Sequence, residues 1–435
     1  MKKRYSYQAY PDQGQQKQLA RLFGCVRVVF NDYIAQRRLL HRHGMSKEVP
    51  ARHTAQLVTR VAKQNLGREF LSDVSAVPLQ HAVKDAQAGY QNFFDSHSGK
   101  RKGPKMGMPK FKKRTGRQKA RFTRNARFSV EHQPGAKWGW VILPKIGAVK
   151  VRFSRDLPVA PSSVTIIGEP DGSYHVSFVV EANPKPAPAP VHDAAGIDVG
   201  IESLAAAVHD DGKTEKIGNP RHLKAQERKL AKAQRSVSRK KKGSKNKAKA
   251  RRKVARIHAK VRNTRSDHHH KLSRRLVDEN QVIAFETLGI KGLLRMRLAK
   301  QISDAAWGHL IRLTEAKATE AGREVIRIPR NYPSTQTCSA CGCRDGKKDL
   351  GTRNWQCPCC HTWLDRDLNA AVNIMIAAGL AQGHTTACAS KDGTTLVSGR
   401  SQTPEGGSVR PERNALAEPM KQEPTEQTPA YAGAA

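Results

Sequence analysis

The sequence predicts a multidomain α+β protein in which a helical and β-barrel half is followed by a mixed α/β half. Three observations predict this fold class. Helical spacing of apolar residues dominates before residue 100, and short apolar strands follow as far as residue 180. A proline-rich stretch then leads into a second half, where strands alternate with long helical segments. The 435 residues suffice for roughly two or three domains, each with its own core.

The charge of the chain indicates its partner. There are 78 lysine and arginine residues against 37 aspartate and glutamate residues, a formal charge of +41. Self-repulsion at this charge favours a polyanion as partner, and nucleic acid is the natural one. No membrane partner is expected, because no apolar run reaches transmembrane length and Met1-Lys2-Lys3-Arg4 leads into polar residues. We therefore expect a cytoplasmic protein.

The first half begins with two amphipathic helices. Apolar residues three and four positions apart predict one helix over residues 10–40 and a second over residues 79–94. On the polar face of the second helix, Gln80, Lys84 and Gln87 could reach DNA bases or phosphates. A solvated helix face is the alternative.

A basic stretch and a set of strands complete this half. Residues 98–127 are rich in Gly, Lys, Arg and Pro, and Lys110, Lys112 and Lys113 lie among aromatic residues, which suits a surface that follows a nucleic-acid backbone. A flexible basic loop is the alternative. Residues 141–143, 149–153, 164–167 and 174–180 read as strands, and a small β-barrel is the simplest way to close their edges. We place the recognition half at residues 1–182 and a proline-rich linker at residues 183–192.

The second half, residues 193–378, is organised around one carboxylate. Asp198 lies within the small-residue strand of residues 196–208, where an ionised carboxylate is costly unless a cation meets it. Glu286 ends another apolar strand, and Asp367, two residues after Asp365, opens an alanine-rich helix. Separate elements that each supply a carboxylate suit a site for two Mg²⁺ ions that hydrolyses phosphodiesters. Taken alone, Asp367 could instead be a helix N-cap.

A strongly basic helical hairpin is predicted over residues 221–277. Arg239, Lys240, Lys241 and Lys242 mark the break between its helices, and the charge density favours phosphate binding. We interpret the adjacent residues 268–270, all histidines, as part of this polar surface. A helix over residues 293–322 and a strand over residues 325–328 follow, so the order of elements resembles an RNase H-like mixed sheet with insertions.

Six of the eight cysteines lie within residues 338–360. Cys338, Cys341, Cys357 and Cys360 form two C-x-x-C pairs about 15 residues apart, the pattern of a structural zinc ribbon, which we place at residues 335–363. Cys343 and Cys359 are surplus. Either Cys359 or Cys360 could be the fourth ligand, but only Cys360 keeps the paired spacing. From residue 379 to residue 435 the composition predicts a disordered tail.

The ordered acids, the cysteine ribbon and the run Asp365-Arg366-Asp367-Leu368-Asn369-Ala370-Ala371 together resemble TnpB-type proteins, the RNA-guided endonucleases encoded by insertion sequences, which are similar to compact type V CRISPR effectors. The similarity extends from the Tyr10-Pro11 pair to about residue 377. It implies a RuvC-like nuclease domain with Asp198, Glu286 and Asp367 as catalytic acids and the four paired cysteines as ligands of one Zn²⁺ ion. It also implies a guide RNA, a double-stranded DNA target cut beside a short motif that the protein reads, and a monomer on one RNA.

Other functions remain open at this stage. A guide-bound repressor that does not cut would normally have lost one acid, and this chain has all three. A guide-free structure-specific nuclease or transposase would not need so large a basic surplus. An RNA-binding ribbon protein without enzymatic activity leaves the ordered acids unexplained.

Overall fold

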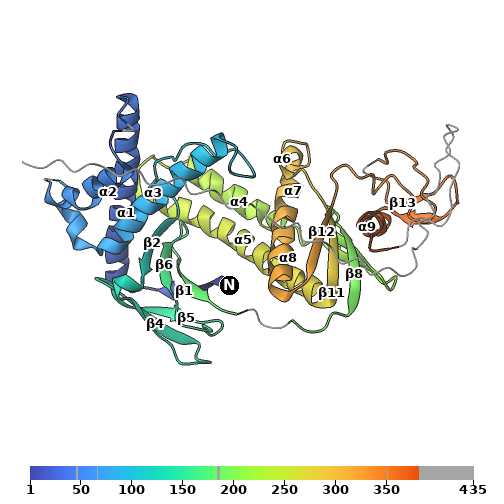
Figure 1. Ribbon diagram of the computed structural model, residues 1–435, viewed down its shortest axis with the longest axis horizontal. Helices are drawn as coiled ribbons and strands as arrows, with labels where there is room; N and C mark the ends of the chain where they lie inside the picture. Colours follow the sequence, from blue (N-terminus) through green and yellow to red (C-terminus); the bar gives the residue numbers. More distant parts are fainter. Residues whose placement is uncertain (46–47, 66, 184–186, 350, 382–435) are drawn as a thin grey trace, which may run out of the picture.

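The computed structural model describes residues 1–45, 48–65, 67–183, 187–349 and 351–381. Figure 1 shows an elongated molecule with one β-sheet region toward each end, bridged by two long helices, α4 (His222–Ser238) and α5 (Lys245–Glu279). Mixed α and β content in several sheets is therefore confirmed. Residues 184–186 of the predicted linker and residues 382–435 of the predicted tail lie outside the described residues.

Two helices, α1 (Gln13–Arg42) and α3 (Ala76–His97), pack on the first sheet, and α2 (Ala51–Thr59) packs against both of them. Helix α1 begins at Gln13 because Asp12 caps it: the Asp12 carboxylate accepts from the Gln15 backbone, and the Gln15 side chain accepts from the Asp12 backbone. One face of α1, including Leu19, Val29 and Ile34, is fully buried in the core of this half.

The first sheet has seven strands in the order β2-β6-β7-β1-β5-β4-β3. They are β1 (Lys2–Tyr10), β2 (Gln118–Thr123), β3 (Ser129–Glu131), β4 (Trp138–Leu143), β5 (Gly147–Arg152), β6 (Ser163–Gly168) and β7 (Tyr174–Glu181).

The prediction of a closed barrel is wrong. Within the described residues, β2 and β3 end the sheet and do not pair with each other. Strand β1, which the sequence analysis left without structure, pairs with both β7 and β5 at the centre of the sheet. Residues of α1 and α3 share one core with the inner face of the strands, so helices cover that face and the sheet has no need to close on itself.

The second sheet has five strands in the order β10-β9-β8-β11-β12. Strands β8, β9 and β10 are antiparallel neighbours, whereas β11 runs parallel to both β8 and β12. Their bounds are β8 (His192–Asp198), β9 (Ser203–His209), β10 (Thr214–Gly218), β11 (Asn280–Glu286) and β12 (Glu324–Ile328).

Helices cover both faces of this sheet. The end of α5 and α8 (Trp307–Ala321) share one core with the strands, and α9 (Arg366–Ala377) packs on β8, β9 and β11. The helix predicted over residues 293–322 is interrupted: α6 (Ile290–Leu293) and α7 (Ala299–Ala305) precede α8, and Ala306 has a φ of 49°. The turn lets the indole of Trp307 donate to the carbonyl oxygen of Gly200, 2.9 Å away, which links α8 to the loop after β8.

The prediction that residues 268–270 form a polar surface is wrong for His269. This side chain is 2% exposed, and its Nδ1 atom lies 3.1 Å from Nδ1 of His309 on α8. The hairpin here is not a free helix pair, because α5 packs along α8. Within the described part of the chain, no helix is both long enough and apolar enough to cross a membrane.

Candidate functional site

Asp198 and Glu286 end two neighbouring parallel strands. Ile197 of β8 pairs with Phe285 of β11, one residue before each acid. Because the two strands run in the same direction, their last residues leave the sheet at one edge. The four residues before each acid, 194–197 in β8 and 282–285 in β11, carry no polar side chain, so the acids are the first polar groups at that edge.

Helix α9 brings the third acid to the same edge. It lies so close to β8 that a Cβ atom on Gly196 would stand 2.2 Å from the carbonyl oxygen of Ala371. Asp367 is one helical turn before Ala371, and Gly196 is two residues before Asp198. The close approach thus positions Asp367 beside the end of β8, where its carboxylate contributes to the raised pKa of Asp198.

Asp365 and Asp367 have different surroundings. The Asp365 carboxylate is the N-cap of α9, accepting from the backbone nitrogens of Asp367 and Leu368 at 3.1 Å, and it pairs with Lys216. Asp367 has one cation at the edge of ion-pair distance, Arg353, whose Nη1 is 4.0 Å from the carboxylate. The capping role therefore belongs to Asp365, and Asp367 is left for the site.

The electrostatics of the site favour a bound cation. Burial, together with the nearby carboxylates of Asp367 and Glu286, raises the pKa of Asp198 to about 7, against an opposing effect of Arg366. Burial also raises the pKa of Glu286. The negative charges of Asp367 and Glu286 thus disfavour ionisation of Asp198, and a divalent metal ion would relieve this repulsion.

The spacing of the acids bears on how many ions they could hold. Among the described residues, the groups of three or more potential ligands whose atoms all lie within 4.8 Å of one another do not include these three acids. A single ion held by all three would need a closer cluster. Two ions would not require all three carboxylates to converge on one point, so this spacing would suit a pair of ions better than a single one.

The paired cysteines do form a compact cluster. The sulfur atoms of Cys338, Cys341, Cys357 and Cys360 lie within 4.8 Å of one another. Sγ of Cys338 is 3.7 Å from Sγ of Cys360, and Sγ of Cys341 is 3.6 Å from Sγ of Cys357. Zinc–sulfur bonds of about 2.3 Å in a tetrahedron place sulfur atoms about 3.8 Å apart, so this cluster can hold a zinc ion. A disulfide bond joins Cys343 to Cys359, so Cys359 is not a free thiol and Cys360 is the fourth member of the cluster.

The cysteine segment also holds α9 in place, a link that the sequence analysis missed. The side-chain nitrogen of Asn373, which is fully buried, donates to the carbonyl oxygens of Ser334 and Thr337 at 2.8 and 2.7 Å. Asn369 donates to the same two oxygens and accepts from the Ser339 backbone. In the sequence, the signal for this link was two asparagines four residues apart within the apolar part of α9.

The residues predicted to contact nucleic acid differ in how exposed they are. Gln80, Lys84, Lys110 and Lys113 are exposed, Gln87 is half-buried, and Arg239, Lys240, Lys241 and Lys242 lie in the turn between α4 and α5.

Lys112 is the exception among these residues. Its ammonium group lies 3.6 Å from the centre of the Phe30 ring, and burial lowers its pKa to about 8. Its backbone also exchanges hydrogen bonds with the side chain of Asn31. Lys112 therefore contributes to packing.

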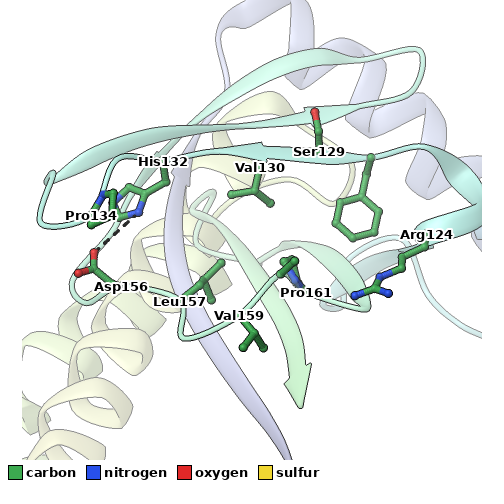
Figure 2. Close-up of a pocket in the computed structure, with 11 residues that line it drawn as sticks. Arg124, Ser129, Val130, His132, Pro134, Asp156, Leu157, Val159 and Pro161 are labelled. Carbon is green, nitrogen blue, oxygen red and sulfur yellow. Dashed lines mark ion pairs between the residues drawn. The ribbon is translucent and has the colours of Figure 1, made fainter. Parts of the chain in front are cut away.

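The pocket drawn in Figure 2 lies away from the acids, on the first sheet. It has a volume of about 440 Å³, and apolar residues such as Val130 and Leu157 point into it. His132 at its edge lies 3.8 Å from Asp156. None of the residues predicted to bind metal or nucleic acid lines it.

Comparison with solved structures and family models identifies the fold class. The fold is similar to that of Cas12f1, solved as a complex with single-guide RNA and target DNA, with a TM-score of 0.52 over 83% of each chain at 14% sequence identity. Residues 307–374 also match the model of the Cas12f1-like TNB domain, which spans the cysteine cluster and most of α9. The molecule thus has a Cas12f-like fold.

Within that class, the chain belongs to the TnpB family of IS605-type transposons. Residues 177–297 match the OrfB_IS605 model, described as a probable transposase. A protein of Streptomyces pristinaespiralis named "Putative RNA-guided DNA endonuclease" is 39% identical over 88% of this chain and 90% of its own length. InsQ of Escherichia coli, which has the same description, is 28% identical over 98% of both chains. Residues 1–45 match a helix-turn-helix model, and in the structure they form β1 and α1.

Proposed function

We propose that this chain is an RNA-guided DNA endonuclease of an insertion-sequence transposon, which cuts target DNA beside a short motif that the protein reads. The observation that carries the proposal is that Asp198, Glu286 and Asp367 come to one edge of the second sheet, where the charges of Glu286 and Asp367 disfavour ionisation of the buried Asp198. Within a family whose named relatives are RNA-guided DNA endonucleases, this arrangement supports metal-dependent hydrolysis.

In this mechanism the three acids supply oxygen ligands for two Mg²⁺ ions. When bound, these ions would activate water and stabilise the leaving 3′ oxygen of the DNA strand. The protein's own part is to hold the acids in register: the β8–β11 pairing positions Asp198 and Glu286, and α9 positions Asp367. The strand order β10-β9-β8-β11-β12, with three antiparallel strands followed by two parallel ones, supports an RNase H-like (RuvC-like) nuclease domain.

The ribbon would hold one Zn²⁺ ion on Cys338, Cys341, Cys357 and Cys360. Its role in this proposal is structural, because hydrogen bonds between this segment and Arg366, Asn369 and Asn373 hold the helix that carries Asp367. The basic turn of Arg239, Lys240, Lys241 and Lys242, in which Lys240 is half-buried and the others are exposed, suits the phosphate backbone of a guide RNA. We propose that one chain binds one RNA.

The test compares Asp198→Asn with Asp211→Asn, an exposed aspartate in the turn after β9. We expect Asp198→Asn to abolish Mg²⁺-dependent cleavage of a matched DNA target, because it removes a ligand of the catalytic ions. RNA binding should be unchanged, and Asp211→Asn should cut normally. Undiminished cutting by Asp198→Asn would overturn the assignment.

Guide dependence needs its own measurement. RNA that co-purifies with the protein from cells carrying its transposon should consist of one discrete transcript. Recovery of no discrete transcript would favour a guide-free nuclease or transposase. Discrete RNA with target binding but no cutting would favour a repressor.

A further inference from the structure

We propose that the outer face of the first sheet is a binding surface for unpaired nucleotides. The surface, termed here the aromatic platform, consists of Tyr10, Trp138, Trp140, Lys150 and Arg152 on strands β1, β4 and β5. It is separate from the acids, which lie toward the other end of the molecule (Figure 1). The inference does not depend on the proposed cleavage.

Strand register arranges the platform in two rows. Tyr10 pairs with Lys150, and Lys150 pairs with Trp140, so these three side chains lie side by side across three strands. In the next row, Gln8 pairs with Arg152, and Arg152 pairs with Trp138. Successive residues of one face are about 7 Å apart along a strand, so the platform presents aromatic and cationic groups in alternation.

These side chains are not part of a core. Trp138, Trp140 and Tyr10 are 40%, 43% and 39% exposed. The residues that alternate with them, including Val141, Val149 and Val151, are completely buried on the opposite face of the same strands. The first sheet is therefore stabilised by packing on its inner face. Exposing two tryptophans on its outer face has no evident structural purpose.

Contacts within the platform fix the Trp138 ring and leave the Trp140 ring exposed to solvent. Lys150 Nζ lies 4.6 Å from the centre of the Trp138 ring, and Tyr10 meets the same ring edge-on at 5.3 Å between centroids. Trp138 is thus oriented by its neighbours. Trp140, the most exposed of the three, offers a flat surface next to a lysine.

The chemistry of the platform selects single-stranded nucleic acid as its occupant. Aromatic rings stack on the faces of unpaired bases, and neighbouring cations bind the phosphates that link them. A duplex is disfavoured because its base faces are already stacked on one another. Glu131 of β3, which pairs with Trp140, places an acid beside the platform, and its carboxylate can accept from a base amino group such as that of cytosine.

The test measures binding of labelled single-stranded oligonucleotides to the full chain in a buffer without added Mg²⁺, which withholds the metal needed for cutting and leaves the zinc ribbon intact. Fluorescence anisotropy with RNA and DNA oligomers of the same mixed sequence would give Kd values. We expect Trp140→Ala to weaken binding about 10-fold, the amount that loss of one stacked base produces. Trp140→Phe, which keeps a ring, should retain most of the affinity.

Charge is tested by Lys150→Ala against Lys213→Ala, an exposed lysine in the turn before β10. Only Lys150→Ala should weaken binding. A loss confined to RNA would support a guide-side contact, and a loss confined to DNA would support a contact with an unpaired DNA strand. Unchanged Kd values for Trp140→Ala with both RNA and DNA would overturn the proposal, even if Asp198→Asn abolishes cutting.

Discussion

Gly196 lies directly against Ala371: a Cβ atom on Gly196 would be 2.2 Å from the Ala371 carbonyl oxygen and 2.6 Å from Cγ of Met375. Glycine has no Cβ, so α9 can approach β8 closely enough to bring Asp367 to the end of that strand. The distance between a strand glycine and a helix backbone thus determines whether the proposed site is complete.

We expect Gly196→Ala to push α9 away from β8. Overpacking of this kind costs about 1–3 kcal/mol of stability, and the displaced Asp367 should lower the cleavage rate well beyond the loss of folded protein. Thermal unfolding and cleavage rates would be measured side by side. Gly218→Ala is the control, because a Cβ there meets nothing within 4 Å. Normal cutting by Gly196→Ala would mean that α9 does not position the third acid.

The hydrogen bonds from α9 to the cysteine segment give a second prediction. Asn373→Ala leaves two buried carbonyl oxygens with one fewer donor, so we expect the protein to lose about 1–3 kcal/mol of stability and part of its cleavage rate. Zinc content should not change, because no cysteine is altered. Asn92→Ala, on an exposed position of α3, should have no effect on either measurement.

Zinc stoichiometry distinguishes the paired cysteines from the surplus ones. We expect one zinc per chain in the wild type, as measured by atomic emission. Cys341→Ser should lose it and destabilise the ribbon, because binding of a structural zinc ion contributes directly to folding. Cys343→Ser should keep it, since Cys343 lies outside the quartet. Loss of zinc from Cys343→Ser would place this residue among the ligands.

The buried histidine pair predicts a pH dependence of stability. Burial, with a smaller contribution from His309, lowers the pKa of His269 from 6.5 to about 4. The unfolded chain therefore binds a proton more readily than the folded chain, so stability is complete above pH 6.5 and is lost as pH falls toward 4. For His269 alone, the free energy of unfolding should fall by about 2 kcal/mol between pH 7 and pH 5.

Urea unfolding at both pH values would measure this loss. In His269→Gln the contribution of His269 should disappear, whereas His258→Gln, exposed on the same helix, should behave like the wild type. An equal loss in His269→Gln and wild type would contradict the assignment.

Local sequence was sufficient to select candidate residues where the chemistry of a residue depends on its immediate neighbours. Asp198 and Glu286 could be singled out because each ends an apolar strand, and the cysteine spacing indicated a metal cluster. The same reasoning failed for β1, because its partners β5 and β7 lie more than a hundred residues away. Without β1, the remaining strands suggested a barrel. His269 was misjudged for a related reason: its surroundings include His309, which comes from another helix. The packing of Lys112 on Phe30 likewise depends on a residue from another element.

The sequence by itself determined the charge of this protein, its family and the chemical groups available for metal and phosphate. Only the tertiary structure decided which of these groups meet. The register of β8 with β11, the approach of α9 to Gly196 and the anchoring of α9 by the cysteine segment each join residues that are distant in the chain. Such contacts depend on the packing of whole elements against one another, which no local pattern of residues encodes.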